Sequence, residues 1–471
     1  MNNETLRQLP SVDELMNAAA LEGLEEHYSR DVIVNATRTV LEELRLAITA
    51  AETASPTPEG FSVESICKRI TSYLHDKFSP SLRKAVNATG IILHTGLGRA
   101  VLSQQAIDAI NDVAQGYCTL ATDLETGRRG HRDVHLNDLL CELTGAEAAT
   151  VVNNNAAATM LILNTLAKGR EVIVSRGQLV EIGGSFRMPE VMQTSGAILK
   201  EVGTTNKTHL RDYVAAISEN TGAILRVHQS NYRIVGFFEE PPIEDLVAVG
   251  RDHNLPVMDD LGSGALVNLS EYGLEAEPMV QDSIKAGADA VCFSGDKLIG
   301  GPQSGVIVGK AGVTERIRKN PLARAMRIGK MTIAAMEATL RLFLNPDVLN
   351  QKHPCYQMFS CSLEELGRRA QAVADRLAAS TTQAAEVSVM DGGSQVGSGS
   401  VPAQTIPTRL LRVKPAAVSA QVLARMLRCC APRIFARVQH EAVLLDFRTI
   451  RPDEDALVQE ALCQLLGEGE S

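Results

Sequence analysis

Between residues 86 and 345, short apolar runs rich in β-branched residues alternate with longer segments of helical periodicity. This alternation limits the possible folds more than any other feature of the chain. Several runs are apolar at every position, as expected for strands covered on both faces. The pattern predicts an α/β fold with a mainly parallel sheet and helices on both sides. The candidate strands are Ala149–Val152, Glu171–Ser175, Ala197–Val202, Ala223–His228, Leu255–Asp260, Ala290–Ser294 and Ser304–Gly309.

The regions on either side of this core have different patterns. Residues 11–50 have helical periodicity, and Ser11 with Glu14 matches a capping box. A shorter helix is predicted over 61–77, before a Ser-Pro pair. We therefore expect a helical amino-terminal domain (1–77), a linker (78–85), a large α/β domain (86–345) and a small α+β domain (346–471).

Composition excludes several classes of protein. The chain has 471 residues, 45% of them apolar, and a net charge of −10, which argues against a wide nucleic-acid-binding surface but not against a local basic patch. Its nine cysteines are scattered and form no CxxC pair, so we expect reduced thiols and no metal site. The first residues lack the features of a signal peptide, and no apolar run reaches membrane-spanning length. These features predict a soluble cytoplasmic protein with no membrane or DNA partner.

Lys297 and Asp260 each stand at the carboxyl end of a predicted strand. Open α/β sheets build their sites at these strand ends. A lysine amine beside a carboxylate suits pyridoxal phosphate, because the lysine forms a Schiff base and the carboxylate keeps the ring nitrogen protonated. Taken singly, an exposed loop lysine and a helix-capping aspartate remain the alternative, since most Lys and Asp residues are exposed.

Three successive asparagines, Asn153, Asn154 and Asn155, follow a predicted strand and precede an alanine-rich helix. The free N–H groups and the dipole at a helix start attract anions. An ordinary N-cap is the alternative, but three asparagines exceed what a cap needs, and they favour phosphate binding. Asn231 and Ser294, near the ends of neighbouring strands, are predicted to face the same cofactor site.

Basic and glycine-rich stretches form a second group of candidates. "HTGLGRA" at 94–100 and "GRRGHRD" at 127–133 let backbone and guanidinium groups approach an anion. Arg324 and Arg327 are three residues apart and share one face if that segment is helical. A solvated basic face is the default interpretation of such a pair.

Long ordered motifs resemble a known family. The segments "NNNAAA", "SRGQLVEIGGSFRMP", "EVGTTNKTH", "DLGSGALVNLSEYGL" and "FSGDKLIGGPQSGVIVGK" are similar to those of bacterial L-seryl-tRNA(Sec) selenium transferase, the selenocysteine synthase. The likeness runs from about residue 80 to 345 and continues in "DFRTIRPDED" near the carboxyl end. The amino-terminal helical domain is similar in architecture, with a weaker sequence likeness.

The resemblance implies a fold-type-I pyridoxal-phosphate enzyme of the aspartate aminotransferase class. It also implies a homodecamer built from dimers, with the amino-terminal domain holding the tRNA. Lys297 matches the Schiff-base lysine, Asp260 the acid beside the ring nitrogen, and residues 153–155 the phosphate site. Arginines that match those receiving the anionic selenium donor are Arg99, Arg324 and Arg327. The family usually has asparagine where this chain has Gly96, which puts any side-chain contact from that position in doubt.

The reaction that the resemblance implies starts from L-seryl-tRNA(Sec). β-Elimination of water leaves aminoacrylyl-tRNA, and selenophosphate then adds selenium to give L-selenocysteinyl-tRNA(Sec). One rival is a pyridoxal-phosphate lyase acting on a small amino acid or amino sugar phosphate on the same scaffold, because fold does not fix substrate. Look-alikes of that type tend to lack the amino-terminal domain. A second rival is a tRNA-binding or assembly protein with a silent pocket, but this chain keeps both Lys297 and Asp260.

The charge of the amino-terminal region fits tRNA binding poorly. Residues 1–80 hold 13 acidic and 7 basic side chains, a net charge of −6. Nucleic-acid binding usually gains affinity from neutralised phosphates. Either RNA shape is recognised or a local basic patch makes the contact. The candidate patch consists of Lys68, Arg69, Lys77, Arg83 and Lys84.

Overall fold

A computed structural model describes residues 6–7, 9–18, 21, 23–50, 61–183, 186–380, 384–401 and 404–467. The chain divides into two compact units, Met1–Lys84 and Ala85–Ser471. Among the described helices, none is long and apolar enough to cross a membrane.

The amino-terminal unit is helical, as predicted, but the region 11–50 is not one continuous helix. Ser11 Oγ accepts a hydrogen bond from the backbone N of Glu14 at 3.1 Å, which caps the first short helix. Apolar faces of the two long helices meet in a core that includes Ile33, Leu41 and Ile70. The helices of this unit are α2 (Val12–Met16), η1 (Gly23–Glu26), α4 (Arg30–Ala50) and α5 (Val63–Phe78).

A seven-stranded sheet forms the centre of the second unit, in the order β2-β10-β9-β8-β7-β3-β6. All neighbouring pairs are parallel except those of β10, which runs antiparallel to β2 and β9. The strands are β2 (Ala148–Val152), β3 (Glu171–Ser175), β6 (Ile198–Val202), β7 (Thr221–Val227), β8 (Val257–Gly262), β9 (Ala290–Ser294) and β10 (Gly305–Gly309). Each predicted strand is confirmed within a few residues, and so is the mainly parallel α/β fold.

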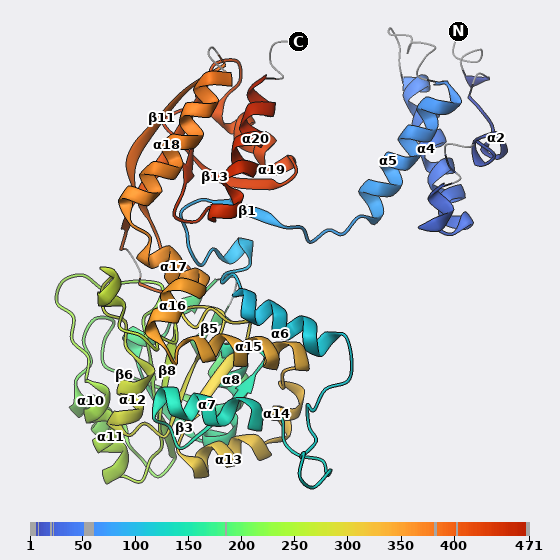
Figure 1. Cartoon of the computed structure of the whole chain (residues 1–471). Coiled ribbons are helices and arrows are strands. Elements are labelled where there is room, and N and C mark those ends of the chain that lie inside the picture. Colours follow the sequence, from blue (N-terminus) through green and yellow to red (C-terminus); the bar gives the residue numbers. More distant parts are fainter. Residues whose placement is uncertain are drawn as a thin grey trace. The chain divides into compact units, whose positions relative to one another are not determined.

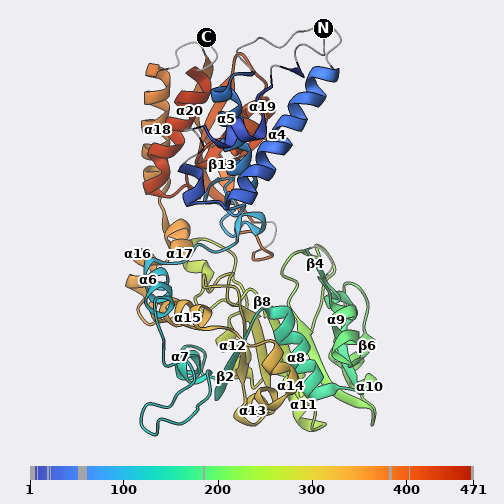
Figure 2. The ribbon, with the colours of Figure 1, turned by 90° about the vertical axis from the view of Figure 1, so that its right-hand side faces the viewer.

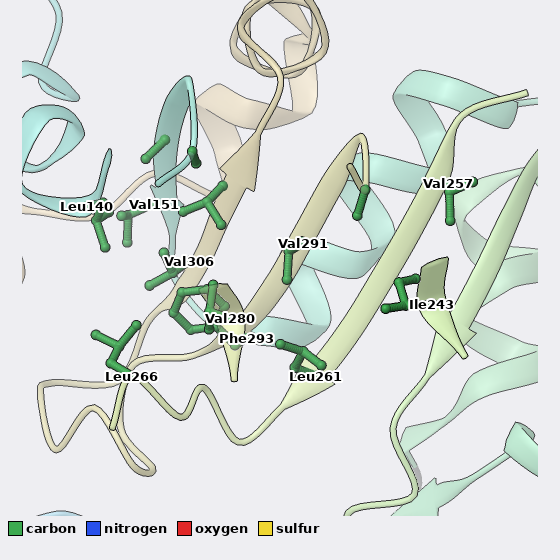
Figure 3. Close-up of a cluster of buried hydrophobic side chains, with 14 of the residues drawn as sticks. Leu140, Val151, Ile243, Val257, Leu261, Leu266, Val280, Val291, Phe293 and Val306 are labelled. Atoms are coloured by element: carbon green, nitrogen blue, oxygen red, sulfur yellow. The ribbon is translucent and has the colours of Figure 1, made fainter. Parts of the chain in front are cut away.

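Helices cover both faces of this sheet (Figure 1). Side chains from α7, α11, α12 and α15 pack on one face, against strand residues such as Val151, Val291 and Phe293 (Figure 3). Helices α8, α9 and α13 pack on the other face. This two-sided burial explains why the strands are apolar at every position.

The second unit contains α-helices and short 3-10 helices. They are η3 (Thr95–Leu97), α6 (Gln104–Ala114), α7 (Val134–Thr144), α8 (Asn155–Ala167), η4 (Arg176–Gln178), α9 (Met188–Ser195), α10 (Leu210–Ala216), α11 (Ile243–Asp252), η5 (Leu269–Tyr272), α12 (Val280–Ala286), α13 (Ala311–Lys319), α14 (Pro321–Ala325), α15 (Lys330–Leu342), α16 (Pro346–Lys352), α17 (Pro354–Ser360), α18 (Leu363–Ser380), α19 (Ala420–Cys429), η6 (Pro452–Glu454) and α20 (Asp455–Gly467). A small hairpin of β4 (Glu181–Ile182) and β5 (Phe186–Arg187) stands apart from both main sheets.

A five-stranded sheet with the order β1-β13-β14-β12-β11 lies in the carboxyl-terminal part, and α18, α19 and α20 pack on it (Figure 2). Its strands are β1 (Ala85–Ala88), β11 (Ala385–Ser394), β12 (Ile406–Pro415), β13 (Arg433–Gln439) and β14 (Ala442–Asp446). Strand β1 begins in the segment expected to be a linker, and it pairs in parallel with β13, from Ala85 opposite Arg433 to Ala88 opposite Ala436. The sequence pattern did not indicate this long-range pairing.

Candidate functional site

The carboxyl ends of β8 and β9 place Asp260 and Lys297 in one buried site. Both residues are 4% exposed. At the end of β8 the pairing with β9 shifts by one residue between Asp260 and Gly262, and Gly262 has a φ of 64°. A Cβ at Gly262 would lie 3.9 Å from Lys297 Nζ, so the chain turns closely around the amine. The structure therefore brings together the two residues on which the predicted cofactor site depends.

Three hydrogen-bond donors surround the carboxylate of Asp260. Asn155 Nδ2 and Thr159 Oγ1 each donate to it at 2.8 Å, and the backbone N of Gly262 donates at 3.1 Å. Burial raises the pKa of Asp260, while these donors and the charge of Lys297 lower it. A protonated pyridine nitrogen would supply the close cation that a buried carboxylate needs, so the site fits pyridoxal phosphate.

The amine of Lys297 is held in conditions that favour its neutral form. Burial lowers the pKa of Lys297, and the nearby charge of Arg99 lowers it further, against the opposing effect of Asp260, Asp296 and Glu277. A neutral amine is the form that attacks a carbonyl carbon and accepts a proton.

The three asparagines at the start of α8 have different partners. Asn153 donates its backbone N–H to the carbonyl of Met326 at 2.8 Å. Asn154 caps the helix, because its Oδ1 accepts from Ala157 N at 2.8 Å. Asn155 holds Asp260. Phosphate binding here would therefore rely on the first backbone N–H groups of α8, which point out of the helix.

Arg99 pairs with the residue that precedes Lys297. Its Nη1 lies 2.9 Å from Oδ2 of Asp296, and the pair is partly buried. Arg99 has a φ of 63°, which is uncommon for a residue with a side chain. Asp296 was not singled out from the sequence, although its position next to the lysine was a usable signal.

Arg324 and Arg327 are exposed residues that line a separate cavity. Arg324 is in the short helix α14, whereas Arg327 lies beyond its end and bridges to Val152, so the condition of one shared helical face is not met. Both line a cavity of about 540 Å³. Lys297, Asp260 and Arg99 do not line this cavity. Its other cationic residues are Arg129, Arg132, Arg318 and Lys319.

The remaining candidates from the sequence are Ser294, Asn231 and His228. Ser294 ends β9 and is buried, three residues before Lys297. Asn231 is exposed, and its Nδ2 donates to the carbonyl of Glu181 at 2.8 Å. His228, after β7, has its Nε2 3.2 Å from Oε2 of Glu277.

Sequence reasoning also missed Thr159 and Glu277. Thr159 lies one helical turn after Asn155, so the spacing of four residues was a signal for a shared face. Glu277 lies in a loop, and its contacts depend on tertiary structure alone.

The described residues contain no group of three or more His, Cys, Asp or Glu side chains arranged to hold a metal ion. All nine cysteines are free.

Comparisons with known proteins give consistent results. Residues 85–451 match the L-seryl-tRNA selenium transferase family, and residues 6–45 match the selenocysteine synthase N-terminal family. A protein named L-seryl-tRNA(Sec) selenium transferase from Alkaliphilus metalliredigens is 47% identical over 457 residues, which cover 97% of this chain and 98% of that protein. One of the same name from Nitratidesulfovibrio vulgaris is 46% identical over 471 residues, covering 99% and 100%.

Among solved structures, a D-glucosaminate-6-phosphate ammonia-lyase has a TM-score of 0.56 at 21% identity, covering 84% of this chain and 99% of that one. That likeness concerns the fold alone. The family match spans most of the chain, and the similarity to the relatives runs over nearly its whole length. The chain therefore belongs to the L-seryl-tRNA selenium transferase family.

Proposed function

We propose that this protein converts L-seryl-tRNA(Sec) into L-selenocysteinyl-tRNA(Sec), with selenophosphate as the selenium donor. The observation that carries the proposal is the buried pair of Lys297 and Asp260 at adjacent strand ends, in a chain similar to selenium transferases over nearly its full length. The protein is an enzyme, and its cofactor is pyridoxal phosphate.

Four groups of this chain would hold the cofactor. Lys297 would bind it covalently, Asp260 would hold the ring nitrogen, and the start of α8 with Ser294 would bind the phosphate. When bound, pyridoxal phosphate supplies an electron sink that stabilises negative charge at the substrate's α-carbon. The hydrogen bonds from Asn155 and Thr159 fix the carboxylate of Asp260 in place, so the acid needs no reorganisation during the reaction.

Lys297 has a second role as the base. With its amine free, Lys297 would remove the substrate's α-proton, and burial lowers the pKa of Lys297, which favours the unprotonated form that this step needs. Loss of the β-hydroxyl needs a proton donor close by, and the protonated Lys297 can return its proton there. The same lysine would therefore move both protons.

Arginines attract the anionic selenium donor in this scheme. Arg99, held by Asp296, stands beside the lysine, and its charge acts on Lys297. Arg324 and Arg327 belong to the cation-rich cavity, which suits a phosphorylated ligand.

The architecture of the complete enzyme is also proposed. The helical unit would bind tRNA. Residues 86–345, except for strand β1, would form the catalytic domain, and residues 346–471 with β1 would form the small domain. Subunits would assemble in the cytoplasm as a homodecamer built from dimers. Light scattering after size-exclusion chromatography would measure the subunit number.

The visible absorption spectrum of the purified protein tests the proposed function. We expect a Schiff-base band that shifts when seryl-tRNA(Sec) is added and does not shift with free serine. The Lys297→Ala variant should lack the band. A band that responds to free serine, or to an amino sugar phosphate, would instead indicate a lyase for small substrates. Absence of any band with added pyridoxal phosphate would refute the assignment of Lys297.

A further inference from the structure

A serine hydroxyl without a partner is buried beside the amine of Lys297. Ser230 follows the end of β7 and is 1% exposed, and its Oγ has no hydrogen-bond partner. Leaving a buried hydroxyl unpaired costs free energy, so such a group usually has a ligand or water as its partner.

Two glycines show where this hydroxyl lies. A Cβ at Gly262 would be 3.7 Å from Ser230 Oγ and 3.9 Å from Lys297 Nζ, so the two side chains border the same small space. A Cβ at Gly399 would be 3.2 Å from the same Oγ. The loop that contains Gly399 thus packs against Ser230 from the carboxyl-terminal part of the unit.

The order of strands fixes which part of the cofactor this space can receive. In pyridoxal phosphate the lysine joins the aldehyde carbon, and the ring carbon that carries this group lies between the ring carbon bearing the phosphate arm and the ring carbon bearing the 3-hydroxyl. Asp260 would hold the ring nitrogen, and the start of α8, packed beside β10, would hold the phosphate. The 3-hydroxyl must then lie on the opposite side of the ring, towards β7, the neighbour of β8.

Other polar side chains after β7 already have partners. His228 faces Glu277, and Gln229 Nε2 donates to the carbonyl of Gly177 at 3.0 Å. Asn231 is exposed and donates to Glu181. Of the four polar residues from 228 to 231, Ser230 is the one that is buried as a whole, and its hydroxyl has no hydrogen-bond partner; Nε2 of His228 also lacks a hydrogen bond, but it lies 3.2 Å from the carboxylate of Glu277.

We propose that Ser230 Oγ donates a hydrogen bond to the 3-oxygen of the bound cofactor and so tunes the charge of the imine formed with Lys297. This inference rests on the proposed roles of Lys297 and Asp260. The 3-oxygen carries its full negative charge when the imine nitrogen is unprotonated, so a donor there stabilises the unprotonated form. Ser230 would thus touch the cofactor directly, whereas the sequence pattern pointed to its neighbour Asn231.

A pH titration of the visible absorption of the holoenzyme tests the proposal without measuring turnover. In Ser230→Ala the midpoint of the titration should rise by about one pH unit or more, as expected for the loss of a hydrogen bond to a charged oxygen. Asn231→Ala should keep the wild-type midpoint. Thr314→Val should also keep it; Thr314 is a buried threonine in α13 whose hydroxyl is likewise unpaired.

Each result has a defined meaning. An unchanged midpoint in Ser230→Ala, or a shift only in Asn231→Ala, would overturn the proposal. Should Ser230→Ala lose the cofactor, Ser230→Thr keeps the hydroxyl and must retain both the cofactor and the wild-type midpoint; a Thr variant that behaves like the Ala variant would also overturn it. A wild-type protein without a Lys297-dependent band would contradict the proposed function itself, which is a separate outcome.

Discussion

The two units of the molecule differ in how exposed their charged side chains are and in how far along the chain the partners lie. In the helical unit, ion pairs are exposed and join residues close in sequence, such as Lys68 with Glu64 and Arg45 with Glu42. In the second unit, charged groups at strand ends are buried, and their partners come from distant parts of the chain; Asn155 and Asp260 are 105 residues apart.

This difference shows where charge serves stability and where it serves chemistry. Exposed pairs contribute little to stability, so the helical unit depends on its apolar core, and its surface charges can be exchanged for contacts with a ligand at little cost in stability. Buried charges cost stability unless they are paired. The catalytic unit keeps such charges at the site of the proposed reaction, and mutations there should have the larger consequences.

The sharpest test compares two neighbouring buried carboxylates of β8. Asp260 faces the proposed cofactor site, while Asp259 points to the other face of the strand and pairs with Arg226 Nε at 3.2 Å. Asp260→Asn removes the charge beside the ring nitrogen but keeps the size of the side chain. We expect turnover to fall by about 10³-fold, the effect of removing one preorganised electrostatic group. Steady-state assays with seryl-tRNA(Sec) would measure it.

Asp259→Asn is the matched control. In this variant the free energy of unfolding should fall by about 3 kcal/mol or more, because Arg226 is left without its partner. The cofactor spectrum of the folded variant should be unchanged. Equal losses of turnover per folded molecule in both variants would show that burial alone, rather than position at the strand end, matters.

A second test uses acid sensitivity. Burial lowers the pKa of His353 to about 4, from an ordinary value of 6.5. As the pH falls below 6.5, the unfolded chain binds a proton that the folded chain does not bind until about pH 4, so stability is lost over this range. The loss should be about 3 kcal/mol. Denaturant unfolding at several pH values should show a smaller loss in His353→Gln than in the wild type. His27→Gln and His75→Gln, at exposed positions of the helical unit, control for the effect of a His-to-Gln substitution itself on unfolding.

The smallest expected effect concerns the proposed binding of tRNA by the helical unit. Lys68, Arg69 and Lys77 are exposed on α5, but Lys68 is already paired with Glu64. Reversing the charge of Lys68 and Arg69 together should weaken tRNA affinity by about tenfold, with Arg69 dominant, and a weaker dependence of affinity on salt. Fluorescence anisotropy with labelled tRNA would measure it.

Arg45→Glu on α4 is the control for charge alone, since Arg45 lies outside the candidate patch. The cofactor spectrum should stay unchanged in every variant of this series. Equal affinity in the wild type and the Lys68/Arg69 variant would show that the patch does not contribute to tRNA binding, and it would leave RNA shape as the basis of recognition.

The sequence predicted the large sheet well because its strands are buried on both faces and read as continuous apolar runs. Lys297 and Asp260 could be identified from their places after two such runs. Asp296 and Thr159 were within reach, since one adjoins the lysine and the other lies a helical turn from Asn155. Local patterns sufficed wherever the partner residues were close in sequence or at equivalent strand ends.

Other features depend on contacts that no local pattern contains. The partner of Asn231 lies in a small hairpin, so the sequence could not show that this side chain is exposed and bonded to the carbonyl of Glu181. The sequence could not show that the hydroxyl of Ser230 is unpaired, because the groups around it come from distant parts of the chain. Arg324 and Arg327 share a cavity by virtue of a turn after α14, not of the helical spacing assumed for them.

The pairing of β1 with β13 has a consequence for the order of synthesis. Gly90, just after β1, also donates its backbone N–H to Thr449 Oγ1, 359 residues later. A chain leaving the ribosome therefore completes the second half of its length before β1 finds its neighbour. Nascent chains would consequently form the large sheet, with Lys297 and the Asp296 partner of Arg99, before β1 is paired, and the small sheet would be among the last parts of the molecule to form.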